Sequence, residues 1–149
     1  YFFLPTDIAG RAMADAGKGQ NLVDWSAIQD PITKSLGRRL MFVDACQAGQ
    51  VQAGQAYNPR LLGDARAGRF TVFSATSPDQ LAEEHPDIGH GFFTWALMEG
   101  MKGRAMEPRE RAIRASRLGT FIEEEVAYRT QGRQRPEAYA PGSIVLVRP

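Results

Sequence analysis

The chain is poor in the residues that stabilise or anchor several large classes of protein. Its 149 residues include one cysteine, so no disulfide can form within the chain, and a secreted disulfide scaffold is excluded. Charge of neither sign dominates, because 18 Lys and Arg oppose 17 Asp and Glu and leave a net charge of +1. A nucleic-acid-binding protein usually carries a basic excess or a basic stripe, so nucleic acid is not an expected partner.

Long apolar segments are absent as well. No stretch approaches the roughly 20 apolar residues that a transmembrane helix needs, and the first residues lack the charged and apolar regions of a signal peptide. We therefore expect a cytoplasmic protein with no membrane partner. The chain begins on Tyr-Phe-Phe-Leu-Pro without an initiator methionine, which we interpret as a fragment that starts inside a structural element.

What is present is the composition of an ordinary globular domain. Apolar residues make up 43% and charged residues 23% of the chain, and the length fits one domain of about 100–200 residues. Short apolar runs predict buried strands, and apolar residues spaced three and four apart predict helices. The expected strands are 1–4, 40–43, 69–76 and 144–147; the expected helices are about 25–36, with a kink or a start at Pro31, then 92–100 and 117–130. This order favours an α/β fold with a largely parallel sheet.

The remaining segments, 9–20, 50–69, 77–86 and 131–142, are expected to be loops. Segment 50–69 contains three glycines and no long apolar run. Twenty residues without regular structure are uncommon inside a compact domain unless they are functional or disordered. We therefore predict that 50–69 is a flexible, exposed linker.

Cys46 follows closely on the predicted strand 40–43, within the sequence Asp44-Ala45-Cys46-Gln47-Ala48-Gly49. In open α/β sheets, ligand sites lie beyond the carboxyl ends of the strands. Most free cysteines are small buried residues, but an acidic neighbour and small residues around Cys46 favour a nucleophile. A nucleophilic thiolate needs a base, usually histidine. The only histidines are His90, which could form a dyad with Cys46, cap a helix or fill a packed turn, and His85, which lies in an acidic loop.

The segment 42–49 resembles the nucleophile segment of caspase-like cysteine peptidases, whose animal signature is Q-A-C-[RQG]-G with a histidine about 50 residues upstream. Segments 1–7, 73–84 and 89–94 look like the corresponding parts of metacaspases and bacterial orthocaspases. The resemblance implies a caspase-like three-layer α/β/α fold, incomplete in this chain, with linker 50–69 between parts similar to the large and small subunits. It also implies a cysteine endopeptidase with Cys46 as nucleophile and a partner segment, upstream of Tyr1, that carries the catalytic histidine.

Asp44 departs from the animal caspase pattern, which has Gln at this position in enzymes that cut after Asp. An acidic side chain repels an acidic substrate residue and attracts Arg or Lys. Metacaspases and paracaspases carry Asp here and cleave after Arg or Lys, so the resemblance implies that specificity for a peptide or protein substrate. It further implies Glu84 as a second acidic wall, with Glu83 as the neighbouring alternative, and Ser74 as a residue that binds an extended peptide by strand addition.

Self-cleavage is expected in the linker 50–69, after Arg60 or Arg66, because exposed polar segments are accessible to peptidases. No cofactor is expected, and the scattered acidic residues do not form the pattern of an EF-hand calcium loop. A non-catalytic caspase-like scaffold is the alternative function. A thiol redox or acyl-transfer protein is disfavoured by the absence of a second cysteine and of a nucleophile-elbow glycine pattern.

Overall fold

A computed structural model describes residues 2–3, 23–44, 57–77, 80, 82–85, 89–141 and 144–148, with the side chains of 2–3, 23–24, 57–60 and 85 excepted. The chain forms two compact units, Tyr1–Gly37 and Arg38–Pro149. In the first unit, strand β1 (Phe2–Phe3) pairs antiparallel with β2 (Val23–Asp24), and helix α1 (Trp25–Lys34) follows directly. Pro31 lies inside α1, where its missing N–H costs one helical hydrogen bond.

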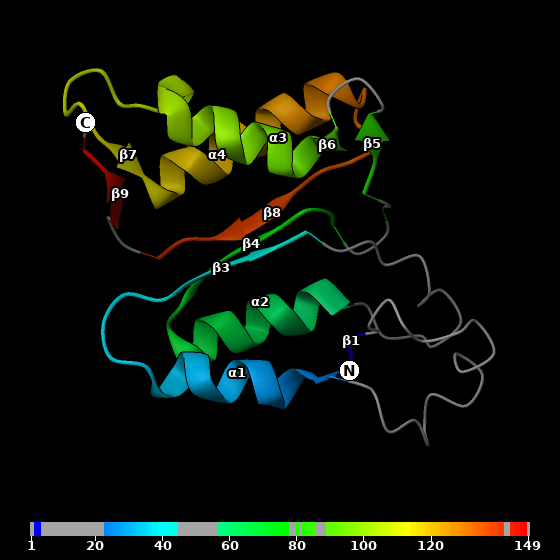
Figure 1. Ribbon diagram of the computed structural model, residues 1–149, viewed down its shortest axis with the longest axis vertical. Helices are drawn as coiled ribbons and strands as arrows, with labels where there is room; N and C mark the ends of the chain where they lie inside the picture. Colours follow the sequence, from blue (N-terminus) through cyan, green and yellow to red (C-terminus); the bar gives the residue numbers. More distant parts are fainter. Residues whose placement is uncertain are drawn as a thin grey trace. The chain divides into compact units, whose positions relative to one another are not determined.

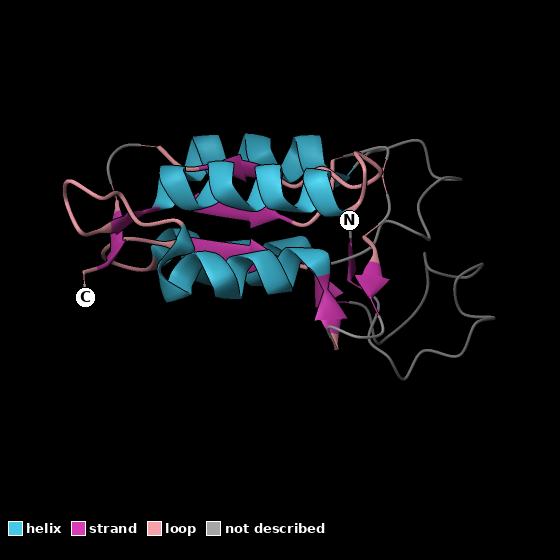
Figure 2. Cartoon of the chain, turned by 90° about the horizontal axis from the view of Figure 1, so that it is seen from above, coloured by secondary structure: helices cyan, strands magenta, loops and turns pink. Residues whose placement is uncertain are grey.

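The second unit is built on a three-stranded sheet with the order β3-β4-β8. Strand β3 (Leu40–Val43) runs parallel to β4 (Thr71–Ser74), and β8 (Glu137–Tyr139) pairs antiparallel with β4. Helix α2 (Tyr57–Gly68) covers one face, while α3 (Phe92–Glu99) and α4 (Ala115–Arg129) cover the other (Figure 1). Within this unit, the axes of α2, α3 and α4 are nearly parallel to the sheet strands (Figure 2). The predicted three-layer α/β/α arrangement is confirmed.

The shorter elements lie at the ends of these layers. Strand β5 (Glu84–His85) pairs antiparallel with β6 (His90–Gly91), which leads into α3. Helix α3 continues into a π-helical turn, η1 (Gly100–Arg104), in which Gly103 has a φ of 124°. Strand β7 (Ile113–Arg114) precedes α4 and pairs antiparallel with β9 (Val145–Val147). Within the described residues, no helix is both long enough and apolar enough to span a bilayer.

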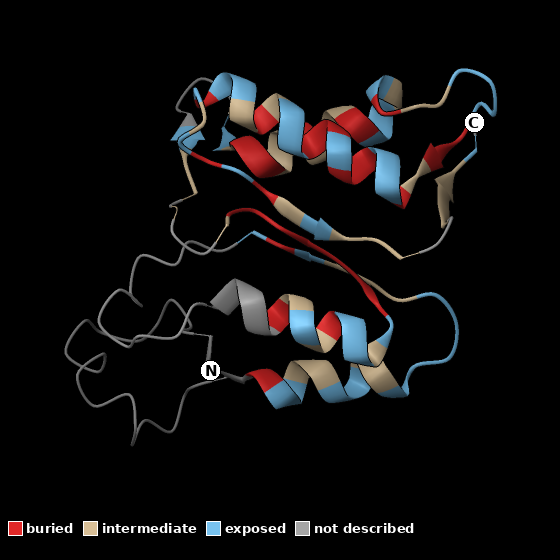
Figure 3. Ribbon diagram, turned by 180° about the vertical axis from the view of Figure 1, so that it is seen from behind, coloured by how far each residue is buried: buried red, intermediate tan, exposed pale blue. Residues whose placement is uncertain are grey.

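The hydrophobic core lies between the sheet and the pair α3 and α4. All four residues of β4 are buried, as expected for a central strand covered on both faces (Figure 3). Gly119 of α4 brings that helix so close to the sheet that a Cβ there would lie 3.0 Å from the Cβ of Ala138 and 3.5 Å from the ring of Phe73. The large side chains that fill this core include Phe73, Phe92, Phe93, Leu118, Phe121, Ile122 and Val126. Burying such a side chain contributes about 1.5–3 kcal/mol.

Substitution by alanine is expected to have opposite effects on the free energy of unfolding at two helical glycines. A Cβ at Gly100 would lie 2.5 Å from Leu118 Cδ1 and 3.0 Å from Phe121 Cδ1, whereas a Cβ at Gly63 in α2 meets nothing within 4 Å. Gly100→Ala is therefore expected to lower the free energy of unfolding by about 1–3 kcal/mol through overpacking. Gly63→Ala is expected to raise it by up to about 1 kcal/mol through helix propensity. Urea unfolding of both variants measures this, and equal effects would contradict the packing of α3 on α4.

The prediction of a linker over 50–69 is wrong from residue 57 onward, because residues 57–68 form α2. Leu61 and Ala65, one helical turn apart, are fully buried, and this narrow apolar strip is too short to produce a recognisable pattern. The guanidinium of Arg66 lies 5.5 Å from the ring centre of Tyr139 in β8. Arg60 and Arg66 thus lie in a helix rather than an extended chain, and cleavage after them is no longer expected. Residues 50–56 lie outside the described residues.

The predicted loop 131–142 is also corrected, since it contains β8. The described sheet is consequently mixed, with one parallel and one antiparallel pair of strands, rather than largely parallel. The last predicted strand exists as β9, but it pairs with β7 and not with the main sheet. Both departures arise from pairing between distant segments, which local composition does not encode.

Candidate functional site

The candidate site lies beyond the carboxyl end of β3, where Asp44 follows Val43 directly. The Asp44 side chain is exposed, and its Oδ2 accepts a hydrogen bond of 2.5 Å from the hydroxyl of Thr94. Thr94 belongs to the first turn of α3. The N-terminus of a helix carries unpaired N–H groups and a partial positive charge, which favour a carboxylate nearby. The fold therefore holds the Asp44 carboxylate against the start of α3.

Gly91 is the point at which Asp44 meets the acidic segment, which we define as the described residues 80 and 82–84. A Cβ on Gly91 would lie 3.5 Å from Asp44 Oδ2 and 3.5 Å from the carbonyl oxygen of Glu83. Glu84 of β5 is the register partner of Gly91 in β6, and paired Cα atoms in antiparallel strands are about 4.5–5.5 Å apart. The structure therefore brings Asp44 and Glu84, both predicted from the sequence, to the same glycine.

Of the two adjacent glutamates, only Glu84 has a carboxylate without a partner among the described residues. Glu83 forms a bidentate ion pair with Arg133, with Nε–Oε1 and Nη2–Oε2 distances of 2.7 and 3.0 Å. The hydrogen bonds from this guanidinium hold the pKa of Glu83 below its usual value. The Glu84 side chain is exposed and forms no hydrogen bond or ion pair within the part of the chain that the structure describes, although its backbone pairs with that of Gly91. Glu84 is thus the glutamate that can bind an external cation.

The profile of the caspase domain, peptidase family C14, matches residues 15–143. The chain belongs to the caspase-domain family. Comparison of the chain with curated proteins found no match, and comparison with solved structures found none either. The family is one of cysteine peptidases, so the predicted relationship to caspase-like peptidases is confirmed. The matched region includes Asp44, Cys46 and Glu84.

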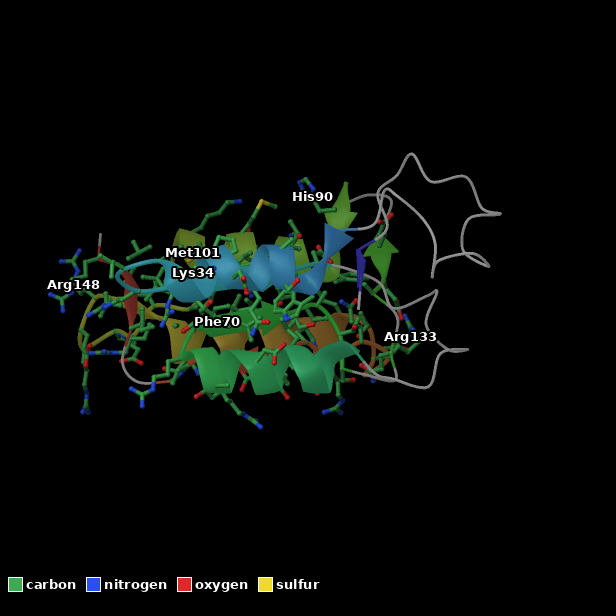
Figure 4. The ribbon with its side chains drawn as sticks, turned by 90° about the horizontal axis from the view of Figure 1, so that it is seen from below. Lys34, Phe70, His90, Met101, Arg133 and Arg148 are labelled. Carbon is green, nitrogen blue, oxygen red and sulfur yellow. The ribbon has the colours of Figure 1, made fainter. Side chains whose placement is uncertain are left out.

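Cys46 lies outside the described residues of this caspase domain, as does the side chain of His85. His90 is exposed at the start of β6, and its imidazole points outward (Figure 4). The N-cap of α3 is Gly91 rather than His90, and an exposed His90 does not fill a packed turn. The two structural roles considered for His90 from the sequence are therefore wrong.

Ser74 occupies the last position of the central strand β4, where it pairs with Val43 on one side and Glu137 on the other. Its side chain is buried. The next residue, Ala75, donates its N–H to the Val43 carbonyl at 2.9 Å and accepts a 2.8 Å bond from the Gln134 side chain. A peptide cannot add to the sheet at Ser74 unless one of these neighbours leaves. The predicted role of Ser74 in strand addition is therefore not supported by its position.

Thr94, Arg133 and Gln134 contact the site residues of the caspase domain but were not singled out by the sequence. Each of these residues forms a hydrogen bond with a partner 50 or more residues away in the chain. A local sequence pattern does not reveal such a contact. No group of three or more His, Cys, Asp or Glu residues that could hold a metal ion is found among the described residues.

Proposed function

We propose that this caspase domain is a cysteine endopeptidase, of the metacaspase or orthocaspase kind, that hydrolyses peptide bonds after Arg or Lys. The observation that carries the specificity is the position of Asp44 and Glu84 around Gly91. Two exposed carboxylates at one point favour a basic side chain and repel an acidic one. Asp44 also lies two residues before Cys46, so a side chain bound by Asp44 comes next to the nucleophile.

In the proposed reaction, the Cys46 thiolate attacks the carbonyl carbon of the basic residue, and the carbonyl oxygen becomes an oxyanion. The backbone N–H of Cys46 stabilises this oxyanion. A histidine upstream of Tyr1 accepts the thiol proton and returns it to the leaving amine as the carbon–nitrogen bond breaks. Water then attacks the thioester, with the histidine as base, and releases the acid and the free thiol.

Reporter peptides that differ only in the residue before the scissile bond test this function. With the full-length protein, we expect kcat/KM for Arg and Lys reporters to exceed that for the Asp reporter by at least about 100-fold, since charge complementarity at one site is worth several kcal/mol. Efficient cleavage after Asp would contradict the role of Asp44 and Glu84. No cleavage of any reporter would favour the alternative, a non-catalytic caspase-like scaffold.

A further inference from the structure

The turn that follows α4, residues 130–135, contacts the acidic segment at several points. The side chain of Gln80 donates to the carbonyl of Gly132 at 3.3 Å and accepts the backbone N–H of Arg135 at 2.5 Å. The ion pair between Arg133 and Glu83 adds a contact between side chains. We call residues 130–135 the supporting turn, because these contacts join it to the acidic segment about 50 residues earlier in the chain.

Gln134 is the buried member of the supporting turn, with a fully buried side chain. Its Nε2 donates to the carbonyl of Ala75 at 2.8 Å, and its Oε1 accepts the backbone N–H of Glu83 at 2.9 Å. Its own backbone N–H donates to the hydroxyl of Thr130 at 3.1 Å. A buried amide is tolerated when its donor and its acceptor are both paired. This single side chain therefore links the end of β4, the acidic segment and the supporting turn.

The backbone of Glu83 is held from two sides. Its N–H bonds to Gln134, and its carbonyl oxygen accepts the N–H of Phe92 at 3.1 Å. Phe92 begins α3, and Thr94 in the same turn holds the carboxylate of Asp44. Glu84 follows Glu83 directly. The contacts thus form a continuous path from Gln134 through Glu83 and the start of α3 to Asp44.

We propose that Gln134 is a positioning residue that sets the substrate specificity of the site by fixing Glu84 relative to Asp44. This inference rests on the proposed function, in which these two carboxylates receive a basic side chain. A carboxylate on a fixed backbone loses less conformational freedom on binding than one on a mobile segment, so it binds the same cation more tightly. Gln134 acts through Glu83 and does not itself touch the substrate.

Hydrogen exchange of the full-length protein tests the structural part of this proposal independently of activity. Gln134→Met keeps a side chain of similar length and removes both hydrogen bonds. Its matched control is Thr71→Val, at a fully buried hydroxyl without a partner among the described residues. We expect the Glu83 amide to exchange at least about tenfold faster in Gln134→Met and at the original rate in Thr71→Val. An unchanged rate at Glu83 in Gln134→Met would overturn the proposal.

A double-mutant cycle tests the functional part. We expect Gln134→Met to lower kcat/KM for an Arg reporter about tenfold, mainly through KM, and to lower it less than about twofold when Glu84→Gln is already present. Equal losses in both backgrounds would show that Gln134 does not act through Glu84 and would overturn the proposal.

The outcomes of the proposal and of the proposed function can be separated. If the unsubstituted protein cleaves no Arg reporter, the proposed function fails, while the exchange rate at Glu83 still decides whether Gln134 holds the acidic segment. If Gln134→Met does not fold, as judged by circular dichroism, Gln134→Asn replaces it. Asparagine keeps the polar amide, but its side chain is one methylene shorter and cannot bridge Ala75 and the Glu83 N–H, so this variant must give the same rise in exchange and in KM.

Discussion

Replacing Cys46 by alanine is expected to abolish cleavage of Arg and Lys reporters, with kcat lowered by at least about 10⁴-fold, as for other enzymes that lose their nucleophile. The reason is chemical, because alanine has no group that can form the thioester. Cys46 is the only cysteine of the chain, so no neighbouring thiol can replace it. Initial rates of reporter cleavage, followed at protein concentrations high enough to detect the residual rate, measure the effect.

The control for this loss of activity is a measurement of whether the Cys46→Ala protein still folds. The thermal unfolding temperature and the far-ultraviolet circular dichroism of Cys46→Ala are expected to match those of the unsubstituted protein, because the change removes one sulfur atom. Cys46→Ala protein that retains full activity would show that the nucleophile is another residue. Loss of activity together with loss of folding would leave Cys46 a structural residue, contrary to the proposed function.

Asp44→Asn is expected to lower kcat/KM for an Arg reporter by about 30- to 150-fold, mainly through KM. Removing one member of a charge pair that becomes buried on binding costs about 2–5 kcal/mol, and each 1.4 kcal/mol is tenfold. We expect the lower part of that range because the Asp44 side chain is exposed before substrate binds. Asparagine retains an oxygen that can accept the hydrogen bond from Thr94, so the substitution removes charge and preserves geometry.

Asp30→Asn provides the matched control for Asp44→Asn. Asp30 is an exposed aspartate of α1 that pairs with Lys34 at 3.4 Å, and such surface pairs contribute about 0–1 kcal/mol. The substitution is expected to leave kcat/KM unchanged. A reporter with Gln before the scissile bond completes the comparison, because Asp44→Asn should affect it far less than the Arg reporter. Equal losses for the Arg and Gln reporters would contradict the role of Asp44 in specificity.

The sequence predicted the elements whose local pattern decides their structure. The apolar run 40–43 is strand β3 with the same bounds, and α4 extends over 115–129 where 117–130 was predicted. Helix α2 was missed because it buries only a short strip around Leu61 and Ala65. Strand β8 was missed because its three residues form a strand through their pairing with β4, and this partner is more than 60 residues away in the sequence.

The residues of the candidate site also differ in whether a local sequence pattern identifies them. Asp44 and Glu84 could be chosen from the sequence, because charge and the resemblance to caspase-like peptidases identify them locally. Their meeting at Gly91 and the burial of Gln134 depend on how β4, α3 and the supporting turn pack. The sequence likewise shows that Ser74 ends a strand but not that β8 occupies the neighbouring edge.

Covalent labelling tests the central claim, that Cys46 is a nucleophile next to a pocket for a basic side chain, most directly. The full-length protein is incubated with two peptidyl fluoromethyl ketones that differ only in carrying Arg or Asp before the reactive group, and the adduct is located by mass spectrometry. We predict a single adduct on Cys46 with the Arg probe, slower labelling in Asp44→Asn, and no adduct with the Asp probe over the same time. Labelling of Cys46 by both probes at equal rates, or an adduct at another residue, would contradict the account.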